Sequence, residues 1–280
     1  MIQLSRYIFL FLTVILCLPI FSKAQQNLFN YENSIKFARY LKTSRQYSFA
    51  AEEYERLNFL WPKDTIVVLE LVQTYRLNHQ CEKLIPSLKL LSIEELIYRN
   101  PIYTKEYLRY ALNCKSSNTQ YFDFASLLSG EEEVFYKTSF FWINQQYDSL
   151  SIFYKREKDY LARTHPNLFD LTKTFDEQKY KKPAAAFLMS SIIPGSGKAY
   201  TKRWGDAFVS FIFIGTNAYA SYRAFKKKGV KSANGWIFGG LAFSFYTANL
   251  WGSGKAVKKY NNDIRLNYQN NAETIIYNSY

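Results

Sequence analysis

The chain has 280 residues, of which 48% are hydrophobic and 21% charged, and its formal net charge is +13. That charge would suit a nucleic-acid binder if it were spread evenly, but residues 25–180 hold twenty basic and twenty acidic residues. Residues 181–260 hold thirteen basic residues and one acid, Asp206, around the most apolar runs of the chain. Basic residues beside apolar runs indicate membrane topology, so we expect membrane lipid as a partner and no nucleic acid.

Residues 1–24 have the pattern of a secretory signal peptide. Arg6 precedes an apolar run from Tyr7 to Phe21, and Ser22 and Ala24 supply small residues for cleavage after Ala24. An uncleaved anchor is the alternative, although Pro19 and the shortness of the run disfavour it. Export would place the mature chain in an oxidising compartment of the cell envelope.

Residues 25–180 show helical periodicity and almost no glycine. One apolar set recurs after a shift of 34 residues. The set is Leu41, Tyr47, Ala50, Tyr54 and Leu57, and its shifted counterpart is Tyr75, Cys81, Leu84, Leu88 and Leu91. A self-match at this period predicts helix–turn–helix repeats that bury their faces against one another. An unrelated helical bundle would also produce such stripes and remains the alternative.

The first of these units resembles the tetratricopeptide repeat. Its matching positions are the turn aromatic Tyr47, the small Ala50, the aromatic Tyr54 and the closing Pro62. The second unit departs from the pattern at Leu84 and Pro86, and degenerate third and fourth units follow around residues 107–128 and 135–154. The resemblance implies a repeat domain over residues 25–180 whose extended surface binds a protein partner.

Cys81 and Cys114 are the only cysteines left after signal cleavage, and we expect them to form a disulfide. In the repeat register, Cys81 starts the second helix of one unit, and Cys114 ends the first helix of the next. Neighbouring helices in such a stack are antiparallel, which brings these two ends together. Two separate buried thiols are the alternative, because cysteine also behaves as a small hydrophobe.

Residues 181–262 contain two uncharged runs, of sixteen residues after Asp206 and of twenty-three after Lys231. A spanning helix needs roughly 20 residues, so we expect spans at about 204–224 and 233–253 that form a transmembrane helix hairpin. The first run is only about 24 Å long as a helix, so its flanking residues Trp204 and Arg223 must extend the span. Two buried helices of a soluble core are the alternative.

Small and polar residues of these runs are expected to hold the hairpin together. Gly235 and Gly239 are four residues apart, and Gly240 has the same spacing to Ser244, which allows two helices to approach closely. From equal rise along the two helices, Asn217 is expected to donate to the backbone near Gly239. A homo-oligomer through the hairpin is left open.

The segment "IIPGSGKAYTKRWGD" at residues 192–206 is not a phosphate-binding loop, because Ile192 and Ala199 replace the glycine and hydroxyl residue of that signature. With the paired runs, it resembles an uncharacterised bacterial membrane domain that joins a P-G-x-G-x-x-Y turn to a helix hairpin. Pro194, Gly195, Gly197 and Tyr200 match that turn, and Lys198 stands where a glutamine is more usual. The family has no assigned activity, so the resemblance implies only that the turn leads the chain into the hairpin at the membrane surface.

No catalytic or metal-binding motif is present, and His79 and His165 lack neighbours with ligand spacing. We therefore expect no enzyme, cofactor or metal. The predicted fold is all-α: a repeat stack, a transmembrane hairpin and a polar tail at 263–280. The predicted function is an inner-membrane scaffold or assembly protein whose repeats lie outside the cytoplasm. The alternatives are an accessory subunit of a transport or channel complex and an envelope enzyme with an unrecognised site.

Overall fold

The computed structural model describes residues 29–280, apart from residues 91–92 and 119. The expected signal peptide, residues 1–24, lies outside the described residues. Within the described residues every regular element is a helix, so the all-α class is correct. The chain divides into two compact units, an N-terminal unit that ends at Leu128 and a C-terminal unit from Ser129 to Tyr280. This division falls inside the expected repeat region rather than at residue 180.

The N-terminal unit is a succession of short helices. Their bounds are α2 (Tyr31–Thr43), α3 (Tyr47–Leu60), α4 (Thr65–Leu77), η1 (Cys81–Lys83), α5 (Leu84–Leu90), α6 (Ile93–Arg99), α7 (Pro101–Asn113) and α8 (Gln120–Ala125). Side chains mark three of the helix starts, since Asn30, Asp64 and Asn100 each accept a hydrogen bond from a backbone N–H in the first turn. Pro86 falls in the first turn of α5, where the missing N–H has no helical partner.

The same turn ends α2, α4 and α7. A non-glycine residue with positive φ follows each helix: Arg45 at 59°, His79 at 52° and Lys115 at 48°. At the first turn Arg45 donates its backbone N–H to Lys42 and Gln46 donates to Leu41, and the other two turns repeat both bonds. This is the Schellman arrangement, which satisfies the last carbonyls of a helix. Its first two copies lie 34 residues apart, at the period of the sequence self-match.

Large aromatic and aliphatic side chains form the core of the N-terminal unit. Tyr54, Tyr107 and Phe124 are fully buried. Tyrosine hydroxyls within the core reach polar partners, as Tyr75 donates to Glu55 at 2.8 Å and Tyr103 to the carbonyl of Thr65 at 2.7 Å. Such a core gains from burying apolar surface while its polar atoms keep their hydrogen bonds.

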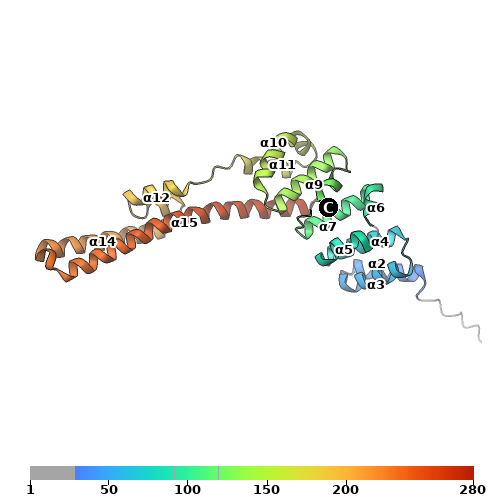
Figure 1. The fold of residues 1–280 in the computed structure, drawn as a ribbon, viewed down its shortest axis with the longest axis horizontal. Coiled ribbons are helices and arrows are strands. Elements are labelled where there is room, and N and C mark those ends of the chain that lie inside the picture. The colour runs from blue at the N-terminus through green and yellow to red at the C-terminus, as the bar shows by residue number, and fades with distance from the viewer. Residues whose placement is uncertain (1–28, 91–92, 119) are drawn as a thin grey trace, which may run out of the picture. The chain divides into compact units, whose positions relative to one another are not determined.

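The C-terminal unit contains a helical cluster and a long hairpin (Figure 1). Its helices are α9 (Gly130–Ile143), α10 (Tyr147–Thr164), α11 (Pro166–Asp176), α12 (Pro183–Ile192), α13 (Ser196–Tyr200), α14 (Trp204–Lys228), η2 (Gly229–Lys231) and α15 (Ala233–Tyr277). A fourth Schellman turn, with Gln145 at a φ of 57°, joins α9 to α10. Trp142 is buried between these helices and α11, where its indole N–H donates to Thr172 at 3.0 Å.

Helix α15 links the hairpin to the cluster, because its 45 residues run from the hairpin tip to the faces of α9 and α11. The segment expected as a polar tail, residues 263–280, belongs to this helix as far as Tyr277. Gln269, Ala272 and Ile276 are buried along one stripe, and the Tyr147 hydroxyl donates to Gln269 at 3.3 Å. Residues 263–280 therefore include a packed helix face, although their composition is mostly polar.

Candidate functional site: a polar cavity at the base of the hairpin

The turn at residues 193–195 ends α12 and redirects the chain. Ile193 has an extended backbone, φ −123° and ψ 109°, as a residue before proline prefers. Gly195 follows with φ +90°, and a Cβ at this position would lie 2.2 Å from the carbonyl oxygen of Ala207 on α14. Both the backbone angle and the close approach therefore require glycine.

Gly197 is the point where α12, α13 and α15 meet. A Cβ here would lie 2.2 Å from the Ala186 carbonyl oxygen and 2.8 Å from Cβ of Ser253. The N–H of Gly197 donates to Ser190 Oγ at 2.9 Å, and that hydroxyl shares a 2.6 Å hydrogen bond with Ser253. The second motif glycine thus allows three helices to close around a buried pair of hydroxyls.

The hairpin region (residues 181–261) is closed at its base by Lys181 and Asn261. The N–H of Lys181 donates to the Asn261 amide at 3.1 Å, and that amide donates back to the Lys181 carbonyl at 2.8 Å. The Lys181 ammonium lies over the rings of Tyr200 and Tyr260, at 4.7 and 4.1 Å, and donates to the Tyr200 carbonyl. Tyr200 of the motif therefore fixes the point where the chain enters the hairpin region.

Two of the predicted packing glycines face α14. A Cβ on Gly235 would collide with the Phe225 ring at 2.5 Å, and one on Gly239 would lie 3.0 Å from Ser221 Oγ. Among the described residues, no heavy atom lies within 4 Å of a Cβ built on Gly240, so its expected packing role in the hairpin is wrong.

The prediction for Asn217 is also wrong. Its amide donates to the Phe213 carbonyl of its own helix at 2.7 Å, not to α15. Ser221, one turn further along α14, makes the contact between the helices by donating to the Gly235 carbonyl at 2.8 Å. The difference arises because η2 sets where α15 begins, and equal counting of residues along both helices ignores that offset.

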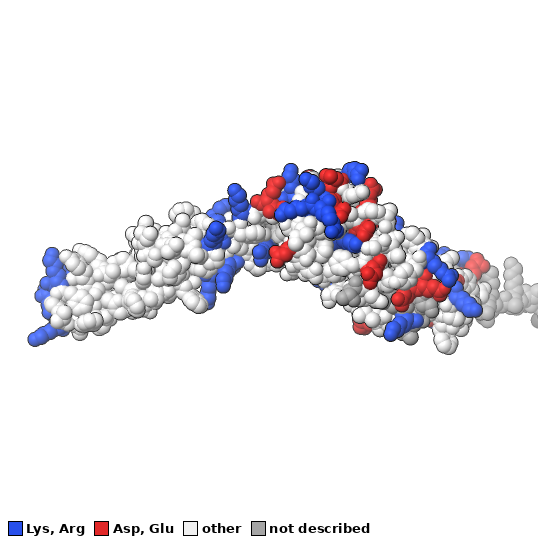
Figure 2. All heavy atoms as spheres, turned by 45° about the horizontal axis from the view of Figure 1, so that its top comes forward, with Lys and Arg blue, Asp and Glu red and all other residues white. Residues whose placement is uncertain are grey.

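The outward surface of the hairpin region is apolar. The exposed large hydrophobic residues are Phe187, Leu188, Met189, Ile192, Ile193, Trp204, Phe208, Val209, Phe211, Ile212, Phe213, Tyr219, Tyr222, Val230, Trp236, Ile237, Phe238, Leu241, Phe243, Phe245 and Trp251. Figure 2 shows an uncharged surface on the hairpin between basic side chains at its tip and at its base. The tip carries Lys226–Lys228 and Lys231. Monomeric soluble proteins rarely expose a contiguous apolar area of this kind.

Among the described residues, no helix has both the length and the apolarity needed to cross a membrane. The spans predicted at 204–224 and 233–253 lie in α14 and α15. Their crossing of a membrane stays a prediction.

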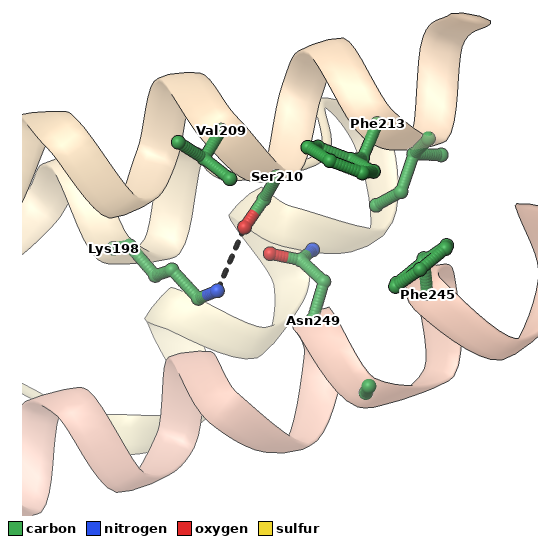
Figure 3. Close-up of a pocket in the computed structure, with 8 residues that line it drawn as sticks. Lys198, Val209, Ser210, Phe213, Phe245 and Asn249 are labelled. Atoms are coloured by element: carbon green, nitrogen blue, oxygen red, sulfur yellow. Dashed lines mark hydrogen bonds between the residues drawn. The ribbon is translucent and has the colours of Figure 1, made fainter. Parts of the chain in front are cut away.

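A cavity of about 230 Å³ lies between α13, α14 and α15 (Figure 3). Its polar groups are Lys198, Ser210 and Asn249, and its apolar walls are Val209, Phe213, Ile214, Phe245 and Ala248. The Lys198 ammonium donates to Ser210 Oγ at 2.7 Å, and this hydroxyl donates to the Asp206 carbonyl. Asn249 is only 2% exposed, and neither atom of its amide has a hydrogen-bond partner among the described residues.

The sequence did not predict this cavity. From the sequence, Lys198 is only a departure from the glutamine that is more usual in the turn motif, and no role is predicted for Asn249. A usable signal was present, since Asn249 interrupts an uncharged run and has the small residues Ala248 and Gly252 beside it. Nothing in the sequence, however, gives the angle at which α13 approaches the hairpin.

Cys81 and Cys114 are joined by a disulfide, with their Cα atoms 5.4 Å apart. Each cysteine stands beside a Schellman turn, Cys81 two residues after His79 and Cys114 directly before Lys115. The bridge therefore connects the ends of two helix pairs within the N-terminal unit.

Neither histidine belongs to a metal-binding group among the described residues. His165 stacks on the Phe135 ring at 4.1 Å, and burial lowers the pKa of its imidazole. Across the part of the chain that the structure describes, no three His, Cys, Asp or Glu side chains are grouped to hold a metal ion.

Comparison with known proteins gives no further guide to this site. The chain matches no family model, no curated protein and no solved structure.

Proposed function

We propose that the protein is a membrane-anchored scaffold of the bacterial cell envelope. In this proposal the hairpin region inserts into the inner membrane, and the helix pairs of residues 25–180 bind a protein partner outside the cytoplasm. The observation that carries the proposal is the exposed apolar surface of α12, α14 and α15, bounded by basic side chains at both ends.

The length of this surface suits a bilayer. The uncharged residues of α15, from Ala233 to Gly254, extend about 33 Å along the helix, against a hydrocarbon thickness of about 30 Å. Trp204 and Trp251 lie near one end and Trp236 near the other, and all three are exposed. Tryptophan is enriched at both membrane–water interfaces.

The interior of the hairpin explains why each helix alone is only moderately apolar. Residues buried between the helices include Ser221, Gly235, Asn249 and Ser253. Hydropathy along one helix averages these inward residues with the outward phenylalanines. Helix association in lipid uses small residues and interhelical hydrogen bonds in this way, so we propose that α12, α14 and α15 insert as a packed group.

The scaffold part of the proposal rests on the repeated helix pairs. Schellman turns at Arg45, His79, Lys115 and Gln145 fall inside the four units that resemble tetratricopeptide repeats. A groove of about 310 Å³ in the N-terminal unit is lined by Asn58, Phe59, Tyr75, Lys83 and Pro86, among other residues. Asn58 Oδ1 is buried there without a partner among the described residues, which supports binding of a peptide that supplies a donor.

Charge substitutions on the outward surface test the membrane proposal in the full chain. Phe211 and Phe243 are 50% and 70% exposed, so Phe211→Lys with Phe243→Lys removes little packing. In a bilayer each lysine costs about 3 kcal/mol. We expect the wild-type chain to stay in the membrane pellet after alkaline carbonate extraction, and the double variant to move to the soluble fraction.

Phe59→Lys is the matched control, because Phe59 is 83% exposed but lies on α3 of the N-terminal unit. This variant should stay in the pellet. Recovery of the wild-type chain in the soluble fraction, or identical behaviour of the double variant and the wild type, would contradict membrane insertion.

A crosslinking experiment tests the scaffold part separately. The partner crosslinked to the wild-type chain in native membranes is identified by mass spectrometry, and the same crosslink is then measured in Phe59→Asp. We expect Phe59→Asp to reduce that crosslink and the outward substitution Phe243→Ala to leave it unchanged. An undiminished crosslink in Phe59→Asp would contradict partner binding at this groove.

A further inference from the structure

The cavity between α13, α14 and α15 combines a cation, an unpartnered amide and aromatic walls. In Figure 3, Lys198 and the Asn249 amide point into the same space beside Ser210, while Phe213 and Phe245 line the continuation of that space. The two rings are 5.6 Å apart, centroid to centroid, in a tilted arrangement. One end of the cavity is therefore polar and positively charged, and the other is apolar.

The polar end has unused hydrogen-bonding capacity. The Ser210 hydroxyl already accepts from Lys198 and donates to the Asp206 carbonyl. Lys198 keeps two further N–H donors and forms no ion pair with any described carboxylate, since Asp206 pairs with Arg203. Neither atom of the Asn249 amide has a hydrogen-bond partner in the part of the chain that the structure describes, although the side chain is almost fully buried. A buried N–H group without an acceptor is unfavourable, so this end is suited to a ligand oxygen that accepts from the Lys198 ammonium and from the Asn249 amide nitrogen.

The cavity also has a direction along the hairpin. Lys198 lies beside Gly252 of α15, with its Cε 3.5 Å from a Cβ built there, and Gly252 is close to the basic segment that begins at Lys255. Phe245 is seven residues nearer the hairpin tip, about 10 Å along the helix axis. The charged end therefore faces the base of the hairpin, and the aromatic end faces the uncharged middle.

We propose that this cavity binds a single-chain amphiphile with an oxyanion head group, such as a carboxylate or a phosphate. The head group accepts hydrogen bonds from the Lys198 ammonium and the Asn249 amide nitrogen, and the acyl chain lies against the rings of Phe213 and Phe245. The membrane as the source of the ligand follows from the proposed insertion of the hairpin. The hydrogen-bonding chemistry of the cavity does not depend on that insertion.

The binding test uses the full chain in dodecyl maltoside micelles with a photoreactive fatty acid. We expect saturable labelling of peptides from α14 and α15 that contain Phe213 or Phe245. The corresponding fatty alcohol lacks the charge, so its labelling should be weaker by about tenfold or by a larger factor. Hydrogen bonds to charged groups are the stronger ones. Equal saturable labelling by acid and alcohol would overturn an oxyanion site.

Variants assign the binding to the two polar side chains. Lys198→Met should weaken fatty-acid binding about tenfold to a hundredfold, and Asn249→Leu about two- to tenfold. Lys258→Met removes an exposed lysine of α15 that does not line the cavity, so this variant should bind the fatty acid as the wild type does. Unchanged binding in both Lys198→Met and Asn249→Leu would overturn the site and leave a hydrated cavity.

A third variant guards against loss of folding in the first two. Asn249→Asp places a carboxylate opposite Lys198, where it pairs with the ammonium and repels a bound anion. We expect this variant to retain helical circular dichroism and thermal stability but to lose fatty-acid binding. A folded Asn249→Asp protein that binds the fatty acid as the wild type does would contradict the proposal.

Two further measurements separate the sources of the ligand and the two proposals. Acetate and inorganic phosphate should compete only at concentrations far above that of the fatty acid, and competition at equal concentration would overturn an amphiphilic ligand. Carbonate extraction is run in parallel. If the chain is found in the soluble fraction and its labelling depends on Lys198, ligand binding in the cavity is supported and membrane insertion is contradicted. If the chain is found in the pellet and its labelling does not saturate, only ligand binding in the cavity is contradicted.

Discussion

The N-terminal unit and the hairpin region bury opposite kinds of residue. In the N-terminal unit, buried Tyr54, Tyr107 and Phe124 form the core. In the hairpin, the buried positions include Ser221, Gly235 and Ser253, while many phenylalanines lie outside. Both regions are helical, so helix formation alone does not distinguish them. They differ in which side chains the packing removes from solvent.

This contrast identifies what stabilises each region. Burial of large apolar side chains stabilises the N-terminal unit, because the hydrophobic effect grows with the apolar area removed from water. The apolar side chains buried in the described hairpin region are small or aliphatic, such as Ala207, Ile214 and Val257. Close backbone approach and hydroxyl contacts, such as that between Ser190 and Ser253 at 2.6 Å, add to this packing. Such packing is effective where the surroundings are themselves apolar.

The largest expected effect comes from removing one phenylalanine from each region. Phe124→Ala in the N-terminal core should lower the free energy of unfolding by about 3–5 kcal/mol, because Phe124 is fully buried. Phe243→Ala on the outside of the hairpin should change it by less than about 0.5 kcal/mol. Denaturant unfolding in micelles, followed by circular dichroism, measures both. A comparable loss for Phe243→Ala would mean that the outer face of the hairpin packs against protein.

The disulfide should stabilise only the N-terminal unit. It closes a separation of 33 residues between Cys81 and Cys114, for which chain entropy predicts roughly 3–4 kcal/mol. We expect Cys81→Ser with Cys114→Ser to lower the midpoint of that unit's thermal transition, and reduction of the wild type to have the same effect. Scanning calorimetry resolves this best if the two units melt separately. An equal shift of the hairpin transition would contradict the assignment of the bridge to one unit.

The helix pairs were predictable from the sequence, but their turns were not. A period of 34 residues connects Leu41 with Tyr75, and Schellman turns follow four residues after each of them, at Arg45 and His79. Glycine is the usual signal for a left-handed residue after a helix, and neither turn contains one. The hydrogen bonds of the turn outweigh the preference of arginine and histidine for negative φ. Amino-acid composition alone does not reveal these hydrogen bonds.

The candidate site was predictable only in part. Gly195 and Gly197 were identified from the motif, and both make close backbone approaches. The partner of Asn217 was wrong by one helical turn, because counting residues along two helices does not give their offset. Lys198 and Asn249 are 51 positions apart in the chain and meet only through the packing of α13. A contact between residues so far apart in the chain leaves no periodic pattern in the sequence from which it could be predicted.

Two glycines test close packing inside the hairpin. Gly197→Ala should destabilise the hairpin by about 1–3 kcal/mol, because the new Cβ meets the Ala186 carbonyl at 2.2 Å. Gly240→Ala should be neutral or stabilise it by up to about 1 kcal/mol, because that site is open and alanine favours the helix. Thermal unfolding of both variants in the same detergent gives the comparison. A neutral Gly197→Ala would show that the three helices do not meet as closely as described.

The smallest expected effect concerns the turn that both units share. Arg45 and Gln145 have φ angles of 59° and 57°. A side chain in this conformation costs about 1–2 kcal/mol, and glycine avoids that cost but loses about 0.5–1 kcal/mol through the entropy of the unfolded chain. Arg45→Gly and Gln145→Gly should therefore each stabilise the protein by about 0.5 kcal/mol.

The matched control is Glu52→Gly, an exposed position inside α3, which should destabilise the protein by about 1 kcal/mol. Opposite signs for the turn and helix positions, measured by denaturant unfolding, would establish that the same backbone turn limits stability in both units. A loss at Arg45 or Gln145 equal to that at Glu52 would mean that the residue is helical rather than left-handed at that turn.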